Sequence, residues 1–337
     1  MTAPLEPLRA ALLASHDFIR DAVLAARDKS SGADLSAIAE VTAADTIYAI
    51  DKISEDAITH WFTAHWPKDE PVELVLEGLE ESGPLTFPKG TPVAATRWKC
   101  IMDPIDGTRN IMYDKRSAWV LSALAPQRGA ATSIADLQIA AMTELSTTKQ
   151  WRSDQISAIA GAGRAGLRAE SLNLFTGLRE PLPLRPSAAT DFRHGFASLA
   201  RFFPDGKALT AQLEEKLWHE IEGAQRGASP LIFDDQYIST GGQIYELLVG
   251  HDRMLGDIRP LVFARLGLKS SLVCHPYDIC TELILREAGG VAEKPDGSRL
   301  DAPLDTVSPV AWIGFANETL AQRARPVLQR LIREMLT

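Results

Sequence analysis

The stretch from Asp103 to Thr108 (DPIDGT) constrains this chain most, because it fixes two carboxylates three residues apart around a proline. Residues 94–102 before it have the mixed apolar and polar pattern of a strand, and residues 117–125 after it form an apolar run of strand length. We therefore expect a loop that presents Asp103 and Asp106 at a strand end. Two carboxylates held together repel one another unless a cation separates them, and hard oxygen ligands favour Mg²⁺ or Mn²⁺ over zinc. The same residues also fit a plain polar turn.

The composition sets the outer limits. With 337 residues and 45% hydrophobic content, the chain suits one large or two medium domains of a soluble protein. A formal net charge of −9 argues against nucleic acid or an anionic membrane as the main partner, although an anionic small molecule stays possible. Three cysteines without a C-x-x-C pair indicate buried thiols in a reducing compartment. Because no signal peptide or membrane-length apolar run is visible, we expect a cytoplasmic protein.

Helical and strand patterns alternate along the chain, which predicts a layered α/β or α+β architecture. Helices are expected at 4–27, 46–65, 205–222, 241–249, 279–288 and 318–336, with a helix-rich stretch at 194–203. Strands are expected at 71–76, 94–102, 117–125, 134–142, 155–160 and 310–315. The proline-rich segment 180–186 is the best boundary. It separates an N-terminal part, residues 1–180, that carries the main metal site from a C-terminal part, residues 187–337, that supplies Asp278 and the substrate pocket.

Further acids stand at the ends of predicted elements. Asp51 lies in the second predicted helix, Glu80 and Glu81 follow a predicted strand, and Asp278 begins a helix. Each has a simpler explanation when taken alone: a surface acid, a solvated turn or a helix cap. For His275 a packing role or a surface position is favoured over metal ligation. The three tryptophans Trp98, Trp119 and Trp151 are expected in the core.

Taken together, these stretches resemble the inositol monophosphatase family of Mg²⁺-dependent phosphatases, whose superfamily includes the fructose-1,6-bisphosphatases. Residues 103–110 (DPIDGTRN) match the family signature D-P-[IL]-D-G-T-x-N at every position, and residues 277–290 (YDICTELILREAGG) match the second signature with Tyr for Trp and Cys for Ala. Residues 78–82 (GLEES) are similar to the family's G-E-E-S with one residue inserted, and residues 45–51 (DTIYAID) to its D-x-V-T-x-x-D. The matches span roughly residues 45–317.

The resemblance implies an αβαβα sandwich and hydrolysis of a small phosphate monoester by a metal-activated water. It implies two or three Mg²⁺ ions in the site, with Mn²⁺ as a possible substitute. The implied metal ligands are Glu80, Asp103, the main-chain carbonyl of Ile105, Asp106 and Asp278. Thr108 would orient the attacking water, Asp51 would support that hydroxyl or accept its proton, and Glu80 completes the implied catalytic set. Substrate contacts would come from Gly107, Thr108, Asp106 and Asp278.

The substrate is where the resemblance stops being informative, because residues 257–276 look like an insertion just before Asp278. An inositol or sugar phosphate is expected. The alternatives are a fructose-1,6-bisphosphatase, a nucleotide 3′-phosphatase, or a catalytically silent member that binds a phosphorylated ligand. A homodimer is expected, with neither nucleic acid nor membrane as a partner. Sensitivity to Li⁺ and the role of residues 111–276 stay open.

Overall fold

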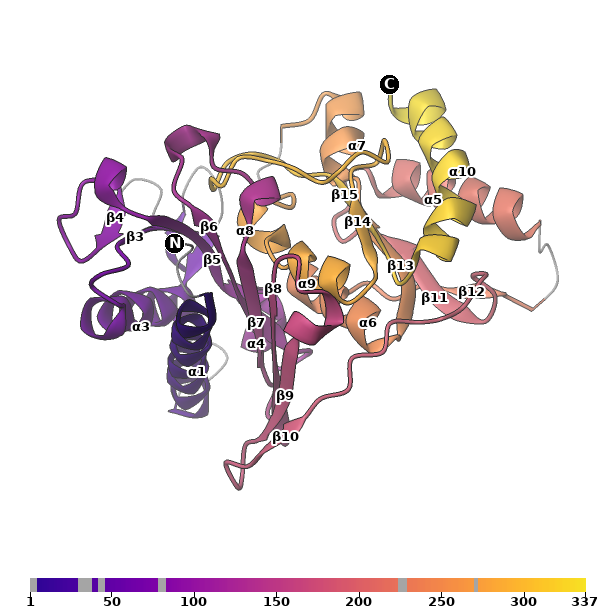
Figure 1. Cartoon of the computed structure of the whole chain (residues 1–337). Coiled ribbons are helices and arrows are strands. Elements are labelled where there is room, and N and C mark those ends of the chain that lie inside the picture. Colours follow the sequence, from indigo (N-terminus) through magenta and orange to yellow (C-terminus); the bar gives the residue numbers. More distant parts are fainter. Residues whose placement is uncertain (1–4, 30–37, 42–45, 78–82, 224–228, 270–271) are drawn as a thin grey trace.

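The computed structural model describes residues 5–29, 38–41, 46–77, 83–223, 229–269 and 272–337 (Figure 1). Its helices are α1 (Leu5–Lys29), α3 (Ala49–His65), α4 (Thr108–Met112), α5 (Lys207–Glu222), α6 (Thr240–Val249), α7 (Arg259–Leu266), α8 (Pro276–Ile279), α9 (Glu282–Glu287) and α10 (Glu318–Leu336). Its strands are β1 (Ile38–Val41), β2 (Thr46–Tyr48), β3 (Val72–Leu76), β4 (Leu85–Phe87), β5 (Trp98–Asp106), β6 (Ala118–Pro126), β7 (Ile139–Leu145), β8 (Arg152–Ile159), β9 (Arg168–Asn173), β10 (Arg179–Pro181), β11 (Gly195–Leu199), β12 (Ile232–Phe233), β13 (Asp252–Asp257), β14 (Val291–Glu293) and β15 (Trp312–Phe315).

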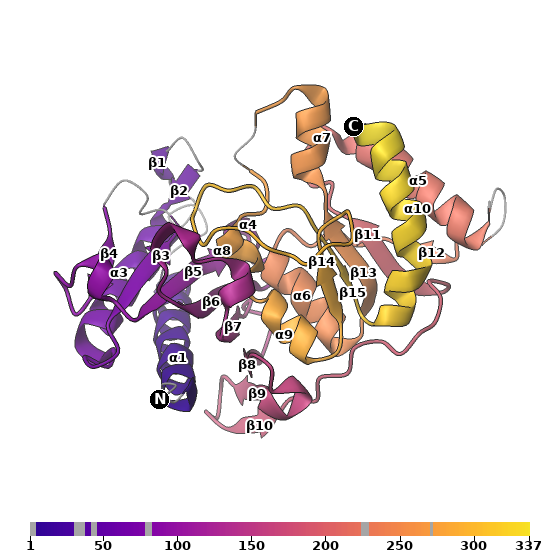
Figure 2. The ribbon, with the colours of Figure 1, turned by 45° about the horizontal axis from the view of Figure 1, so that its top comes forward.

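These elements form five alternating layers, which confirms the expected αβαβα sandwich (Figures 1 and 2). Helices α1 and α3 cover the outer face of the first sheet, and α6, α8 and α9 lie between the two sheets. Helices α5, α7 and α10 cover the outer face of the second sheet. In α1 the apolar side chains at helical spacing are all buried: Leu8, Leu12, Ile19 and Val23. This apolar stripe is what holds α1 against the sheet.

The two large sheets have different topologies, and within the described residues β1 and β2 form a further, two-stranded antiparallel sheet. The first has the order β10-β9-β8-β7-β6-β5-β3-β4 and is antiparallel except for the parallel pair β3–β5. The second has the order β12-β11-β13-β15-β14, with β11 parallel to both of its neighbours. Strands of the first sheet come from residues 72–181 and those of the second from residues 195–315. The proposed division of the chain at 180–186 stays a prediction.

Several predicted elements differ from the structure. Residues 195–199, expected in a helix-rich stretch, form the buried strand β11, and residues 46–48 form β2 before α3 begins. The single helix expected at 279–288 is two short helices, α8 and α9. Residues 134–136 form a 3₁₀ turn ahead of β7. For β11 the hydrogen bonds to β12 and β13, which come later in the chain, outweigh the local pattern.

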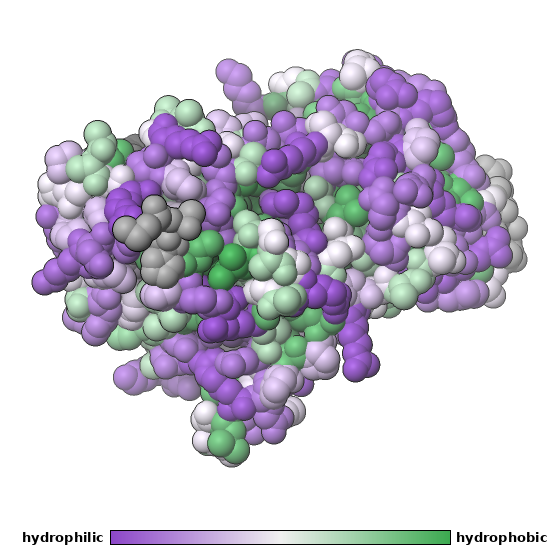
Figure 3. Space-filling model, viewed as in Figure 1, coloured by the Kyte–Doolittle hydropathy of each residue, from purple (hydrophilic) through white to green (hydrophobic). Residues whose placement is uncertain are grey.

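The surface is mostly polar on the face drawn in Figure 3. Exposed apolar side chains occur at the tip of the β9–β10 hairpin, where Phe175 and Leu178 are exposed. Among the described residues, no helix is both long and apolar enough to span a bilayer.

Candidate metal centre

Strand β5 carries both aspartates of the motif, and a β-bulge turns them to the same side. Asp103 is paired with Leu121 of β6 and Asp106 with Trp119, so a three-residue step on β5 opposes a two-residue step on β6. Side chains three residues apart on a regular strand point to opposite faces, and one extra residue restores a common face. Pro104 lies within this bulge, where a missing N–H is tolerated. The aspartates were expected in a loop, and they belong instead to the end of the strand.

The chain leaves β5 at Gly107, which has a φ of 92°. A Cβ at this position would lie 3.0 Å from the carbonyl oxygen of Ile238, so glycine suits both the backbone conformation and the space. Helix α4 begins at the next residue, where the Thr108 hydroxyl donates to the carbonyl oxygen of Ile105 at 2.9 Å. The side-chain amide of Asn110 donates to the Ile238 carbonyl at 2.8 Å. The motif is therefore bound to a segment more than one hundred residues away.

Asp278 reaches the same place from the layer between the sheets. It lies in α8, whose start is set by Pro276, and its carboxylate accepts the backbone N–H of His275 at 2.6 Å. One carboxylate oxygen from each of Asp103, Asp106 and Asp278 lies within 4.8 Å of the other two. The structure thus brings together three of the predicted metal ligands.

Burial and mutual repulsion disfavour negative charge on this cluster. Burial raises the pKa of Asp103 well above its ordinary value, and neighbouring carboxyl groups raise that pKa further: those of Glu77, Asp106 and Asp278. Burial raises the pKa of Asp106 to about 6, although hydrogen bonds from the 239–241 segment lower it in part. The pKa of Asp278 is also raised well above its ordinary value, first by burial and then by Asp106. Three such groups are a natural site for a cation.

Glu77 is a member of the cluster that the sequence analysis missed. In the parallel pair β3–β5, Leu76 lies beside Met102, so the next residue on each strand is Glu77 and Asp103. The Glu77 carboxyl is hydrogen-bonded to that of Asp103. The sequence feature that could have indicated Glu77 is its position directly after the predicted strand 71–76. The family comparison directed attention to Glu80, which lies outside the described residues.

Asp106 is supported from the side of α6, which the sequence analysis also missed. Its Oδ2 accepts the Ser239 hydroxyl at 2.8 Å and the Gly241 N–H at 2.5 Å, and its Oδ1 accepts the Thr240 N–H at 3.2 Å. A Cβ on Gly241 would lie 3.0 Å from Asp106 Oδ2 and 2.5 Å from a methyl of Leu121. Because Gly241 has no side chain, the start of α6 can pack directly against this carboxylate.

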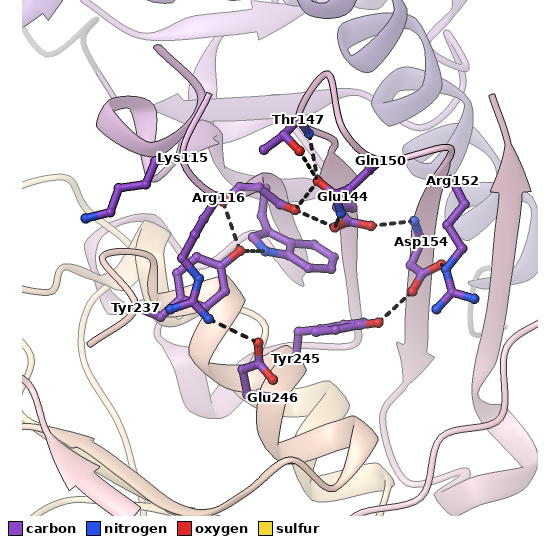
Figure 4. Close-up of a pocket in the computed structure, with 12 residues that line it drawn as sticks. Lys115, Arg116, Glu144, Thr147, Gln150, Arg152, Asp154, Tyr237, Tyr245 and Glu246 are labelled. Carbon is purple, nitrogen blue, oxygen red and sulfur yellow. Dashed lines mark hydrogen bonds and ion pairs between the residues drawn. The ribbon is translucent and has the colours of Figure 1, made fainter. Parts of the chain in front are cut away.

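Figure 4 shows a polar cavity of about 320 Å³ that is lined in part by Tyr237, two residues before Ser239. The Tyr237 hydroxyl donates to the Ser117 carbonyl at 2.9 Å and accepts the Trp119 indole N–H at 3.1 Å. The guanidinium of Arg116 lies 4.0 Å from the centre of the Tyr237 ring. These contacts anchor the chain two residues before Ser239.

The remaining predicted residues have different outcomes. The side chain of Asp51, in α3, lies outside what the structure describes. His275 is buried and stacks on Tyr277 with ring centres 5.2 Å apart, which confirms a packing role. Trp98 and Trp119 are buried as expected, but Trp151 is 52% exposed and its predicted core position was wrong. The three cysteines are free and buried, and burial raises the pKa of each thiol: Cys100, Cys274 and Cys280.

Fold and site together define a five-layered α+β protein with a buried carboxylate cluster at adjacent strand ends. Searches with protein-family models and among curated proteins found no match. Solved structures do match over nearly the whole chain.

Fructose-1,6-bisphosphatase of Leishmania major in its holo form is 15% identical, with a TM-score of 0.65 over 96% of this chain and 93% of that one. The extragenic suppressor protein SuhB of Bartonella henselae is 15% identical, with a TM-score of 0.62 over 97% and 99%. A hypothetical Pyrococcus horikoshii protein with similarities for inositol-1 monophosphatase is 16% identical, with a TM-score of 0.59 over 98% and 99%. The chain therefore has the fold that these structures share, as its motifs predicted.

Proposed function

We propose that this protein is a metal-dependent phosphatase that hydrolyses a small phosphate monoester, with an inositol or sugar phosphate as the expected substrate. The observation that carries the proposal is the convergence of Asp103, Asp106 and Asp278, each of which places one carboxylate oxygen within 4.8 Å of those of the other two. The phosphatases named among the structural neighbours support the choice of reaction.

The residues present fit a magnesium site. All three donors are carboxylates, the hard oxygen ligands that Mg²⁺ and Mn²⁺ prefer. Asp103 and Asp106 are buried and Asp278 is partly buried, so their mutual repulsion is strong without a cation. The carbonyl oxygen of Ile105 would join them, and Glu77 would supply a further carboxylate beside Asp103. A bound divalent ion offsets charge on phosphoryl oxygens and lowers the pKa of a coordinated water. Two or three ions per site, and the part played by Glu80, are proposals drawn from the family resemblance.

The polar groups at the start of α4 would act on water and phosphate. The Thr108 hydroxyl donates to the Ile105 carbonyl at 2.9 Å, which fixes its orientation at the start of the helix. A hydroxyl oxygen can accept as well as donate a hydrogen bond, so Thr108 would orient an attacking water. The N–H groups of Gly107 and Thr108 would donate to phosphate oxygens. Asp51 would support the Thr108 hydroxyl or accept its proton.

The predicted insertion at 257–276 comes just before Asp278 in the sequence, and we propose that it helps to shape the substrate pocket. It contains α7, and Arg259 at its start makes a buried ion pair with Asp257 at 2.5 Å. The guanidinium also lies 4.9 Å from the centre of the Phe202 ring. We further propose a homodimer. The composition and the net charge of −9 favour a cytoplasmic protein without nucleic acid or membrane partners.

A phosphate-release assay tests the reaction. The purified protein is supplied with Mg²⁺ and, in separate wells, inositol phosphates, fructose 1,6-bisphosphate, histidinol phosphate and phosphoadenosine phosphate. Turnover of at least one substrate should disappear with a chelator and return with added Mg²⁺, and Asp106→Asn should lose it by orders of magnitude. Release from fructose bisphosphate or the nucleotide alone would select an alternative substrate. Binding of phosphorylated ligands without release would identify a silent member and refute the enzyme assignment.

A further inference from the structure

The Asp106 carboxylate is bound on one side by a short segment that we call the Asp106 clamp, consisting of Ser239, Thr240 and Gly241. Two of the three clamp hydrogen bonds end on Oδ2, and only the longest, from Thr240 at 3.2 Å, ends on Oδ1. A carboxylate oxygen accepts about two good hydrogen bonds. Oδ2 is therefore saturated by protein donors, and Oδ1 retains capacity for another partner.

Ser239 has two roles in this arrangement. Its oxygen accepts the Gly242 N–H at 2.8 Å, which makes it the N-cap of α6, while its hydrogen is donated to Asp106. One side chain thus fixes both the start of the helix and the rotation of the carboxylate. Ser239 as a whole is only 4% exposed, so water does not readily replace its hydroxyl.

The Asp106 clamp is itself held in place by neighbouring contacts, so it can fix the orientation of the Asp106 carboxylate. Its N-terminal neighbour Ile238 accepts a hydrogen bond from Asn110 of the motif, and Tyr237 is fixed in the polar cavity (Figure 4). A Cβ on Gly242 would lie 2.4 Å from the Tyr237 ring, so helix and ring are in close contact. The motif and the clamp therefore form one rigid unit built from two distant parts of the chain.

We infer that Ser239 is a positioning residue for Asp106: together with the Gly241 N–H it occupies Oδ2 and leaves Oδ1 as the oxygen that faces a metal ion. The inference rests on the proposed metal-dependent function and adds a residue that the motif does not contain. Partners that orient metal ligands commonly change metal affinity roughly ten- to a hundredfold when they are removed.

The test is a titration of the purified protein with Mn²⁺, in which free Mn²⁺ is measured by its electron paramagnetic resonance signal. Ser239→Gly removes the hydroxyl but costs only a few tenths of a kcal/mol as an N-cap. It should weaken Mn²⁺ binding roughly tenfold or more. Ser239→Thr, which keeps a hydroxyl and a cap, should recover most of the affinity.

Asn317→Ala is the matched control, because Asn317 caps α10 by accepting the Leu320 N–H at 3.0 Å, far along the chain from the cluster. It should lower the melting temperature and leave Mn²⁺ affinity unchanged. Unchanged Mn²⁺ binding by Ser239→Gly, beside lost binding by Asp106→Asn, would overturn the role of Ser239 alone. Unchanged binding by Asp106→Asn would overturn the metal site and this inference with it.

Discussion

Asp106→Asn should make the metal-free protein more stable at alkaline pH, even though it removes a residue of the proposed site. Asp106 is 5% exposed, and burial raises its pKa from 3.8 to about 6. A group whose pKa is raised by folding contributes stability below its unfolded pKa, and this contribution is lost as the pH rises through the folded pKa. Each pKa unit corresponds to about 1.4 kcal/mol, so ionisation of Asp106 costs the folded protein about 3 kcal/mol.

The assay is urea unfolding in the presence of a chelator at a series of pH values. From about pH 3 to about pH 8, the wild-type protein should lose about 3 kcal/mol of unfolding free energy relative to Asp106→Asn. Relief of the repulsion on Asp103 and Asp278 acts in the same direction. Asp205→Asn, at an exposed position, is the control and should show a nearly flat difference. A flat profile for Asp106→Asn, or one of opposite sign, would refute the electrostatic account of the cluster.

Addition of Mg²⁺ at the alkaline end should reverse the order of stability. A ligand that binds only the folded state stabilises it by about 2.7 kcal/mol at a hundred times its dissociation constant. The wild-type protein should gain this stabilisation and the variant should not. If Mg²⁺ stabilised both equally, Asp106 would not be a ligand.

Three further outcomes are expected. Gly241→Ala should destabilise the protein by about 1–3 kcal/mol, measured by urea unfolding, because its Cβ would overlap Leu121 and crowd Asp106. Wild-type stability would mean that α6 can move away from the cluster. Glu77→Gln should weaken Mn²⁺ binding with the far-ultraviolet circular dichroism unchanged, and full affinity would show that this carboxylate is not needed. The three cysteines should stay unreactive towards a thiol reagent until the protein unfolds, and rapid labelling of the native protein would contradict their burial.

The layered fold could be predicted because its outer helices are locally encoded. The apolar spacing in α1 and in α10 marks a single buried stripe, and both helices occur where the sequence placed them. Strand β11 was missed because its hydrogen bonds run to β12 and β13, which come later in the chain. No local pattern in a short buried strand distinguishes it from a buried helix.

The metal centre was predictable only as far as its motifs reach. Asp103, Asp106 and Asp278 stand in recognisable signatures, and the structure brings them together. The place of Glu77 beside Asp103 depends on the register of the parallel pair β3–β5, and the sequence alone does not reveal that register. The contact of Ser239 with Asp106 depends on how the start of α6 lies against β5, and the two residues are 133 apart in the sequence.

The bulge in β5 explains why the motif needs that distant support. It turns Asp103 and Asp106 to one side of the strand. As a consequence, two buried carboxylates that repel one another lie close together. In the absence of a cation, either carboxylate would lower its energy by rotating away. Donors from α6 oppose that rotation at Asp106, and the N–H of Ile105, at 2.9 Å, opposes it at Asp103. The fold itself therefore holds the cluster in an arrangement that suits a cation: a main-chain N–H orients Asp103, and a main-chain N–H together with the Ser239 hydroxyl orients Asp106.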